Sequence, residues 1–566
     1  MVCRANQSLA TWVHGCLNLG RAPDFAVLSL ILFTPLVGAA ALVFVDRRRG
    51  DIIRWVANAS TWATFLLAVP LWFRIEPFGA PWQFVERRRW IPAIGADYFL
   101  GVDGFSTLLV LVTTLVAALA VTSSWTSITE RVKEYYCALL VLETGLIGTF
   151  VSLDFLLFFI FWEITLVPMY FLIGMWGAGR PLHSALKFVL YTLLGSVVML
   201  FGVLALYFFN HSVTGVYTFD VTQFQRLTIP FETQKWIFVT LLLGFAVRIP
   251  VFPLHSWLAD AHTDATTAGS VMLTAIGLKT GVYGLIRFSL PILPDATRHY
   301  VPWIVGLSIV GILYAGLLAL AERDWKRLVA YASLSQMAMM TLGVFALTPA
   351  GVTGSIVQQI SHAISIAGLL FVAGLVFEQR HTRDISEYGG LAKVTPVLSA
   401  VFLVMILSFI GLPALNGFIG QMLILQGLYV VHRGWAAVAA GGVVLGAACM
   451  IWLFQRTMLG PADNPANAHL RDVSIRDVAP IVPLIALAIW MGVYPEPFLR
   501  RLQSSVGRVV VRVSPEYGPA IAKAEADCNK PAAPVVVPGA PAGLIVDAPC
   551  TDGSTPEPKP VPPGGR

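Results

Sequence analysis

The chain has 566 residues, of which 57% are hydrophobic and only 12% are charged. Soluble domains carry about 25% charged residues, so this composition excludes an ordinary soluble protein and indicates a protein of the lipid bilayer. The net charge of +6 is spread through loops and forms no basic stripe, so we expect no nucleic acid as a partner.

Apolar runs of about 20 residues predict membrane-spanning helices. The first apolar run starts at Phe25, and residues 1–24 lack the features of a removable signal peptide. Fourteen runs follow: 25–45, 52–72, 103–123, 135–153, 155–176, 185–209, 236–257, 267–290, 302–321, 327–347, 352–377, 395–430, 435–455 and 479–497. The predicted fold class is an all-α polytopic membrane protein with about fourteen transmembrane helices.

Two of these runs are interrupted by proline. Pro250 and Pro253 break the seventh run, and Pro413, between Gly411 and Gly417, breaks the twelfth. Because these runs are five spans apart, they cross the membrane in opposite directions, which predicts two inverted five-helix repeats, helices 4–8 and 9–13. The alternative is that proline and glycine are simply common in membrane helices.

The predicted domain organisation follows from these runs and from the composition of the tail. Residues 515–566 contain twelve prolines among Ala, Val and Gly, a composition typical of a disordered or polyproline-like segment. The expected units are an N-terminal extension (1–24), helices 1–3 (25–130), the two repeats (131–291 and 302–460), a loop with helix 14 (461–500) and a disordered tail (501–566).

Lysine and arginine in the loops predict the orientation. Seventeen such residues follow helices 1, 3, 5, 9, 11 and 13, against ten on the other side up to helix 14. This bias places both termini on the periplasmic side, although the triplet 87–89 opposes it. In that oxidising space Cys3, Cys16, Cys528 and Cys550 could form disulfides.

Arg248 and Lys279 sit near the middle of consecutive apolar runs. A cation at the centre of a hydrocarbon layer costs about 2.5–3.5 kcal/mol on insertion scales. We therefore expect each of these residues to have a compensating partner and a functional role. We therefore interpret 236–288 as the centre of an ion path. Buried lysine exchanges a proton readily and arginine does not, so Lys279 is the leading candidate for a proton relay. The alternative is a lysine pinned permanently to an acid.

Three further titratable side chains lie inside apolar runs. Glu163 is expected to form a permanent ion pair with Arg248, and the alternative to a functional role is a pair that only locks helices together. His362 is either a proton shuttle or a satisfied core histidine. Glu143 is a further accessory candidate with the same two interpretations.

The segment after the first break is also polar. His255, Asp260, His262 and Asp264 form either a polar entrance or a hydrated loop, and the hydrated loop is the simpler interpretation. Arg287 lies near a helix end and is expected to snorkel to the interface.

Several motifs resemble the antiporter-like membrane subunits of respiratory complex I, NADH–quinone oxidoreductase, and are closest to the M type (chain 4). The resemblance covers about 25–500 and rests on FFIFWEITLVPMYFLIGMWG, ALKFVLYTLLGSVVML, PVFPLHSWLADAHTDATTAGSVMLTAIGLKTGVYGLIRF, QQISHAISIAGLLF and GGLAKVTPVLSAVF. It implies a proton-translocating, non-redox subunit in a bacterial inner membrane, beside L-type and N-type neighbours. FMN, iron–sulfur clusters and quinone are then expected in other subunits, with no cofactor in this chain.

By the same resemblance, Glu163, Lys279 and His362 occupy the family's glutamate of helix 5, lysine of helix 8 and histidine of helix 11. Three positions depart from the family pattern: Arg248 replaces a lysine, Gln336 replaces a histidine of many members, and Gln421 replaces a glutamate or lysine. None of these side chains titrates near neutral pH. The sequence therefore predicts reduced or absent pumping with electron transfer retained.

Two alternative functions stay open at this point. One is a structural membrane-arm subunit with a silent channel, which the three departures favour. The other is a subunit of a related cation/proton antiporter or membrane-bound hydrogenase. The chain has no cysteine cluster, haem motif, phosphate loop or dinucleotide fingerprint, and Cys137 and Cys449 lie in apolar runs where they are expected to be inert.

Overall fold

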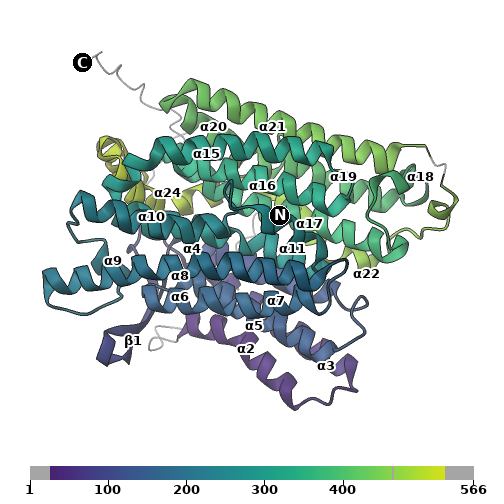
Figure 1. Ribbon diagram of the computed structural model, residues 1–566, viewed down its shortest axis with the longest axis horizontal. Helices are drawn as coiled ribbons and strands as arrows, with labels where there is room; N and C mark the ends of the chain where they lie inside the picture. The colour runs from purple at the N-terminus through teal and green to yellow at the C-terminus, as the bar shows by residue number, and fades with distance from the viewer. Residues whose placement is uncertain (1–25, 462–463, 530–566) are drawn as a thin grey trace, which may run out of the picture.

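The computed structural model describes residues 26–461 and 464–529 (Figure 1). The predicted extension 1–24, the prolines beyond residue 530, the cysteines Cys3, Cys16 and Cys550 and the side chain of Cys528 lie outside the described residues. The predictions made for them are therefore not addressed by the structure.

Ten helices of the described chain are long and apolar enough to cross a membrane. They are α2 (Val27–Phe44), α3 (Gly50–Arg74), α4 (Gly104–Ser123), α5 (Val132–Val151), α6–α7 (Phe155–Gly174), α8 (Pro181–Thr214), α12–α14 (Thr267–Ile292), α15 (Pro294–Ala321), α17 (Pro349–Arg380) and α21 with the π-turn η5 (Arg433–Leu459). The polytopic helical class is confirmed.

The other four predicted runs are helical but shorter, more polar or broken. They are α10 (Phe231–Arg248) with α11 (Ser256–Asp264), α16 (Trp325–Val344), α19 (Pro396–Ile410) with α20 (Asn416–Val431), and α23 (Val482–Val493), which bends by 73° into α24 (Glu496–Val513). Both predicted breaks are confirmed, one after Arg248 and one after Ile410. The count of fourteen spans and the inverted repeats stay predictions.

Short elements complete the described chain. They are the helices α9 (Val221–Phe224), α18 (Leu391–Val394), α22 (Ile475–Val478) and α25 (Gly518–Asn529) and the 3-10 turns η1 (Pro92–Ile94), η4 (Ile385–Glu387), η6 (Pro465–Asn467) and η7 (Pro515–Tyr517).

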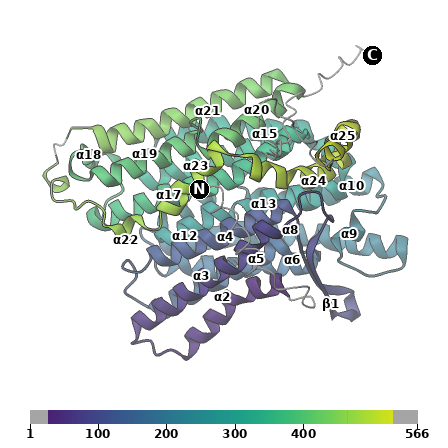
Figure 2. The ribbon, with the colours of Figure 1, turned by 180° about the vertical axis from the view of Figure 1, so that it is seen from behind.

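An antiparallel hairpin and a C-terminal amphipathic helix were not predicted. Strands β1 (Gln83–Ile91) and β2 (Ala96–Val102) pair beside the start of α4. Helix α24 lies at the same end of the bundle as β1 (Figure 2) and buries Phe498, Leu502 and Val506. The expectation of a disordered tail from residue 501 is therefore wrong for 501–513 and for α25. The cause is that the apolar residues of α24 recur every three to four positions and pack on α4, α14, α15 and α17.

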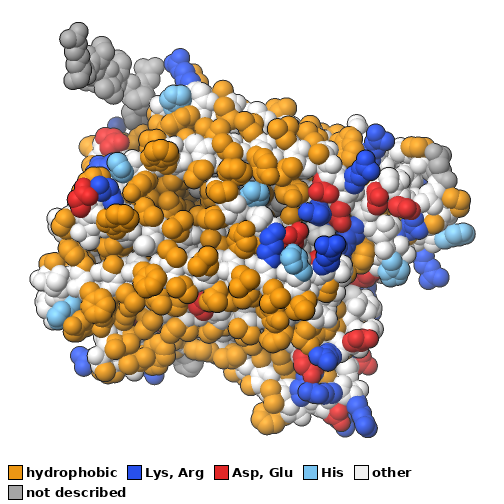
Figure 3. Space-filling view, in the orientation of Figure 1, with side chains coloured by type: hydrophobic (Ala, Val, Ile, Leu, Met, Phe, Trp, Pro, Cys, Tyr) orange, Lys and Arg blue, Asp and Glu red, His pale blue; other side chains and the backbone are white. Residues whose placement is uncertain are grey.

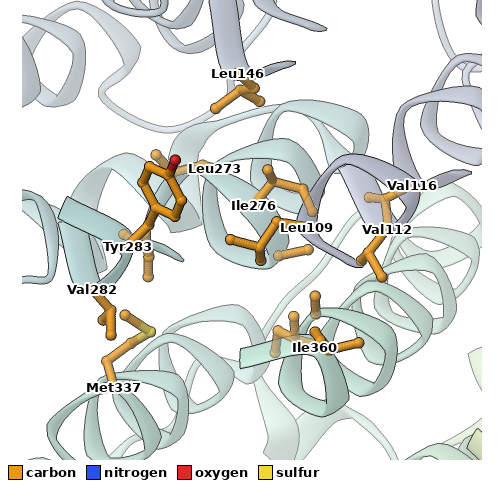
Figure 4. Close-up of a cluster of buried hydrophobic side chains, with 14 of the residues drawn as sticks. Leu109, Val112, Val116, Leu146, Leu273, Ile276, Val282, Tyr283, Met337 and Ile360 are labelled. Carbon is orange, nitrogen blue, oxygen red and sulfur yellow. The ribbon is translucent and has the colours of Figure 1, made fainter. Parts of the chain in front are cut away.

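The interior of the bundle is formed by α4, α12–α14 and α17, which are almost entirely buried, whereas α2, α3, α8 and α21 leave most of their surface exposed. Hydrophobic side chains cover the exposed flank (Figure 3), as expected for a surface that faces lipid. Inside, Leu109 and Val112 of α4 pack with Ile276 and with Ile360 of α17 (Figure 4). This apolar packing surrounds the helix that carries Lys279.

The basic loops meet at one end of the bundle. Arg47 pairs with Glu134, Trp176 Nε1 donates to the Glu130 carbonyl, and Asn464 donates to the Glu387 carbonyl. The hairpin and α24 lie at the opposite end (Figures 1 and 2). The loops that the charge count assigns to the two sides of the membrane thus lie at opposite ends of the bundle.

Candidate functional site

Lys279 follows a widened turn in the central helix. Residues Met272–Gly277 (η2) form a π-helical turn in which the Leu278 N–H donates to the Leu273 carbonyl, five residues earlier. Lys279 Nζ donates to the Thr274 carbonyl over 2.6 Å, and the side chain is 1% exposed. Single π-turns inside α-helices often occur at functional sites. Here the turn supplies an oxygen for a buried ammonium group.

The second partner of Lys279 is His362 of α17. Lys279 Nζ lies 2.8 Å from His362 Nδ1, and His362 is also buried. The ammonium group donates when the imidazole is neutral and carries its proton on Nε2, the tautomer that this contact requires. His362 Nε2 has no hydrogen-bond partner in the described protein. The two groups predicted to carry protons are therefore in direct contact.

Polar side chains extend along α17 from His362. Gln358, four residues before it, donates to Gln336 Oε1 of α16 over 3.1 Å, and Gln359 Nε2 donates to the Ser355 carbonyl. The Oε1 atoms of Gln358 and Gln359 are buried without partners in the described chain. A spacing of three to four residues places these side chains on the same face as His362. Gln336 thus joins the site through Gln358.

Sequence reasoning missed a hydroxyl and amide cluster at the second break. Asn416 Oδ1 accepts from Ser408 Oγ over 2.6 Å, and Asn416 Nδ2 donates to the Ser361 carbonyl. Ser365 Oγ lies 2.5 Å from Ser408 Oγ. Ser361 and Ser365 flank His362 on α17, a spacing that could have been read from the sequence. Gln421 Nε2 contacts the Phe409 carbonyl over 3.4 Å.

Arg248 is buried, but the predicted direct ion pair with Glu163 is wrong. Arg248 Nη2 donates to the Trp162 carbonyl over 3.1 Å and to Thr165 Oγ1 over 2.5 Å, and the guanidinium group lies 4.6 Å from the Trp162 ring centre. Both oxygens belong to the interruption between α6 (Phe155–Ile164) and α7 (Leu166–Gly174), where Thr165 lies.

Glu163 is half-buried and makes no ion pair within 4.0 Å among the described residues. It still acts on Arg248 through longer-range electrostatic attraction. The sequence could not show this arrangement, because neutral oxygens supplied by a helix break leave no charge signature. Arg248 is thus a fixed charge held mainly by neutral acceptors.

Glu143 of α5 is fully buried, and neither of its carboxylate oxygens has a hydrogen-bond partner within the described chain. A buried ionised carboxylate without a partner is very costly. Glu143 therefore lies near the central helices as an isolated acid, apart from the contact between Lys279 and His362.

The segment after the first break is a packed helix, so the expectation of a hydrated loop is wrong. His262 of α11 is fully buried with both ring nitrogens unpartnered in the described chain. Asp260 pairs with Lys187 over 2.7 Å, and Asp264 accepts from Ser184 Oγ over 2.6 Å. These two acids are thus paired with groups of the neighbouring helix α8.

Lys326 of α16 is a further buried cation that sequence reasoning missed. Its Nζ donates to the Ala265 carbonyl over 2.9 Å, and Ser270 Oγ, 3.4 Å away, donates to the His262 carbonyl. These contacts connect α11 with the start of the central helix. A line of polar groups thus reaches from the basic end toward Lys279.

Arg287 does not snorkel. It forms a bidentate ion pair with Asp103, with Nη2–Oδ1 at 2.7 Å and Nη1–Oδ2 at 3.0 Å, and both side chains are buried. Arg287 also donates to Ser106 and Tyr283 and lies over the Trp82 ring. Asp103 was not predicted as the partner of Arg287; it is the first residue of the predicted run 103–123 and also caps α4.

These observations define a class: a polytopic helical membrane protein whose interior carries a line of polar and titratable side chains between two helix breaks. Within the described residues no three His, Cys, Asp or Glu side chains are grouped as metal ligands would be.

The family model described as "NADH:quinone oxidoreductase/Mrp antiporter, TM" matches residues 152–446. The chain is 39% identical to NADH-quinone oxidoreductase subunit M of Rhodobacter capsulatus, over 87% of this chain and 98% of that protein. It superposes on a chain of respiratory complex I from Thermus thermophilus with a TM-score of 0.79 and 28% identity, over 87% of this chain and all of that one.

A chain of the Mrp complex from Dietzia shares the fold, with a TM-score of 0.73 and 21% identity, over 86% of this chain and 52% of that one. The chain belongs to the antiporter-like subunit M family of NADH-quinone oxidoreductase. The resemblance seen in the sequence motifs is thereby confirmed.

Proposed function

We propose that the chain contributes a proton path to the membrane arm of a proton-translocating NADH–quinone oxidoreductase, coupled to quinone reduction in other subunits. The observation that carries this proposal is the 2.8 Å contact between Lys279 Nζ and His362 Nδ1, both of which are buried. A protonated lysine in contact with a neutral imidazole can pass its proton directly to the ring nitrogen, and neither group has to find a new hydrogen-bond partner.

The proposed path has an entry at the basic end and an exit at the second helix break. The proton enters from the basic end past His262 and Lys326 and reaches Lys279 through hydroxyl groups and transient water. It leaves His362 along the face of α17 that carries Ser361 and Ser365 toward Asn416 at the second break. Serine, asparagine and glutamine can hydrogen-bond water that conducts a proton, but they store no charge.

Arg248 and Gln421 weaken this path relative to the family pattern. Arg248 keeps its charge at all physiological pH values, so it cannot change state during a cycle. Gln421 adds no negative charge that would draw a proton toward the second break. We infer that pumping through this chain is reduced rather than lost, because the central exchange pair is intact.

A second candidate is a structural subunit with a silent channel. The neutral side chains Gln336 and Gln421, together with the neutral acceptors of Arg248, favour it. The antiporter or hydrogenase alternative has less support, because the relatives at 36–39% identity over most of the chain are named as subunit M.

The proposal includes partners and location. L-type and N-type antiporter-like subunits are the expected neighbours in a bacterial inner membrane, with both termini periplasmic. FMN, iron–sulfur clusters and quinone belong to other subunits, and this chain acts without an electron-transfer site of its own.

The test is the proton-to-electron ratio of the complex reconstituted in sealed vesicles. We expect Lys279→Ala to lower the ratio with electron transfer retained, because the exchange pair is removed. We expect Gln421→Glu to raise it above the wild-type value, because a titratable group is restored at the second break.

Lys235→Ala is the matched control, since Lys235 pairs with Glu232 on the surface of α10. It should leave the ratio unchanged. An unchanged ratio in an assembled Lys279→Ala complex would instead establish the silent channel and refute the proton path.

A further inference from the structure

Two cavities of opposite character lie side by side at the basic end of the bundle. The first, the basic pocket, has a volume of about 480 Å³ and is lined by Arg47, Thr129, Arg131, Val132, Lys133 and Glu134. The second, the apolar groove, has a volume of about 600 Å³ and runs between α5 and α7. Glu134 lines both, so the pocket and the groove share a wall.

The basic pocket carries uncompensated positive charge. Arg47 pairs with Glu134 over 3.0 Å, which leaves Arg131 and Lys133 as two net positive charges. Lys133 Nζ donates to the carbonyls of Val43 and Val45, which are neutral acceptors. The Arg131 side chain makes no hydrogen bond or ion pair within the described chain, and its backbone is left-handed (φ 48°), which is uncommon for a residue with a side chain. Such a pocket is complementary to an anion.

The apolar groove has the character of a surface that contacts hydrocarbon. Val167 is 57% exposed, Phe171 and Met175 are each 40% exposed, and Val141 and Cys137 form the opposite wall on α5. Trp176, at the mouth, donates its Nε1 hydrogen to the Glu130 carbonyl. Tryptophan at this level is typical of the boundary between lipid headgroups and hydrocarbon.

The dimensions of the groove agree with an acyl chain. The α5 wall runs from Glu134 to Val141, which is about 10 Å at 1.5 Å per residue. One leaflet of hydrocarbon is roughly 15 Å thick. The groove therefore begins at the headgroup level and covers about two thirds of a leaflet. Figure 3 shows charged side chains at this corner of the molecule, next to a hydrophobic flank.

We propose that the basic pocket and the apolar groove together form a binding site for one anionic phospholipid. The phosphate lies among Arg47, Arg131 and Lys133, and one acyl chain lies along Val141, Val167 and Phe171. A soluble anion would use the pocket alone, and a helix of a partner subunit would use the groove alone. The shared wall favours a ligand that has both an anionic headgroup and an acyl chain.

The test is native mass spectrometry of the delipidated full chain in detergent with phosphatidylglycerol or phosphatidylcholine of identical acyl chains. We expect phosphatidylglycerol to bind at least about fivefold more tightly, and Arg47→Gln and Arg131→Gln each to weaken it by about fivefold, the effect of one basic residue near an anionic surface. Both side chains are on the surface, so folding should persist, which unchanged thermal unfolding would verify.

The matched control is the pair Arg88→Gln and Arg89→Gln, exposed arginines at the other end, which should change nothing. Equal retention of the two lipids, or unchanged binding in the Arg47 and Arg131 variants, would overturn the proposal. Displacement of phosphatidylglycerol by millimolar inorganic phosphate would show a soluble-anion site instead.

Two further variants test the groove. Val167→Trp should weaken the binding of both lipids, and unchanged binding would contradict a role for the groove. In assembled membranes, Val167→benzoylphenylalanine should give adducts with phosphatidylglycerol after irradiation. Adducts with polypeptide alone would show that a partner helix fills the groove, and the lipid proposal would fail.

Discussion

Arg287 is a buried arginine whose charge is neutralised by a single carboxylate. Asp103 contacts it through both oxygens, and Ser106 and Tyr283 accept further hydrogen bonds. Removal of one partner of a buried pair leaves an uncompensated charge and costs about 3–5 kcal/mol. This pair joins the start of α4 to the end of the central helix, so its loss acts on the whole interior.

We expect Asp103→Asn to lower the free energy of unfolding by about 3–5 kcal/mol, because asparagine keeps the helix cap but removes the charge. Denaturation of the purified chain in detergent measures this. Asp295→Asn is the control: its pair with Arg298 is exposed, and exposed pairs contribute about 0–1 kcal/mol. Similar losses in both variants would contradict the assigned role of Asp103.

The charged residues of the site could be predicted from the sequence, but their neutral partners could not. Lys279, His362 and Arg248 could be singled out because a charge inside an apolar run is conspicuous. Their partners could not, since the Thr274 carbonyl, Thr165 and Trp162 are neutral groups brought close by a π-turn and a helix break. Asn416 and Ser408 were missed because uncharged polar residues are common in membrane helices.

Helices α17 and α20 are in very close contact. A Cβ added to Gly354 would lie 2.5 Å from the backbone nitrogen of Ile424, and one added to Gly420 would lie 2.7 Å from that of Gln358. Small residues permit such an approach between helices in lipid, where hydrophobic burial provides no attraction between them. The contact places the second break beside the face of α17 that carries His362.

Gly354→Ala should therefore separate the two helices and destabilise the fold by about 1–3 kcal/mol, the usual effect of overpacking. Gly306→Ala in α15 is the matched control, because nothing lies within 4 Å of its added Cβ. Alanine is favoured over glycine in a helix, so this variant should be neutral or up to about 1 kcal/mol more stable. Equal thermal stability of the two variants would argue against close packing.

The elements of the fold were predictable to different degrees. Apolar runs located the helices, because backbone groups in lipid must be satisfied within a helix. The hairpin was missed, since Arg87, Arg88 and Arg89 mask the alternation of β1. Helix α24 was missed because its apolar residues alternate with arginines next to a proline-rich tail, although Phe498, Leu502 and Val506 already show a helical period.

At the scale of the whole molecule, the basic loops lie at one end and the hairpin and α24 at the other (Figures 1 and 2). By the positive-inside rule, we expect the basic end to be cytoplasmic and both termini to be periplasmic. A reporter fused after Arg566 should therefore be active only in the periplasm, and one fused after Arg383 only in the cytoplasm. Cytoplasmic activity of the first fusion would refute this orientation.

Helix α24 joins parts of the chain that are made at very different times. Arg501 donates to the Trp72 carbonyl, 429 residues earlier, and Ser505 Oγ accepts from the Gly104 N–H, 401 residues earlier. A ribosome adds about 5–20 residues per second, so Trp72 is synthesised roughly 20–90 seconds before its partner. The spans α2, α3 and α4 must therefore stay in the membrane with this end open while the rest of the chain is translated. Completion of α24 is the step that closes it.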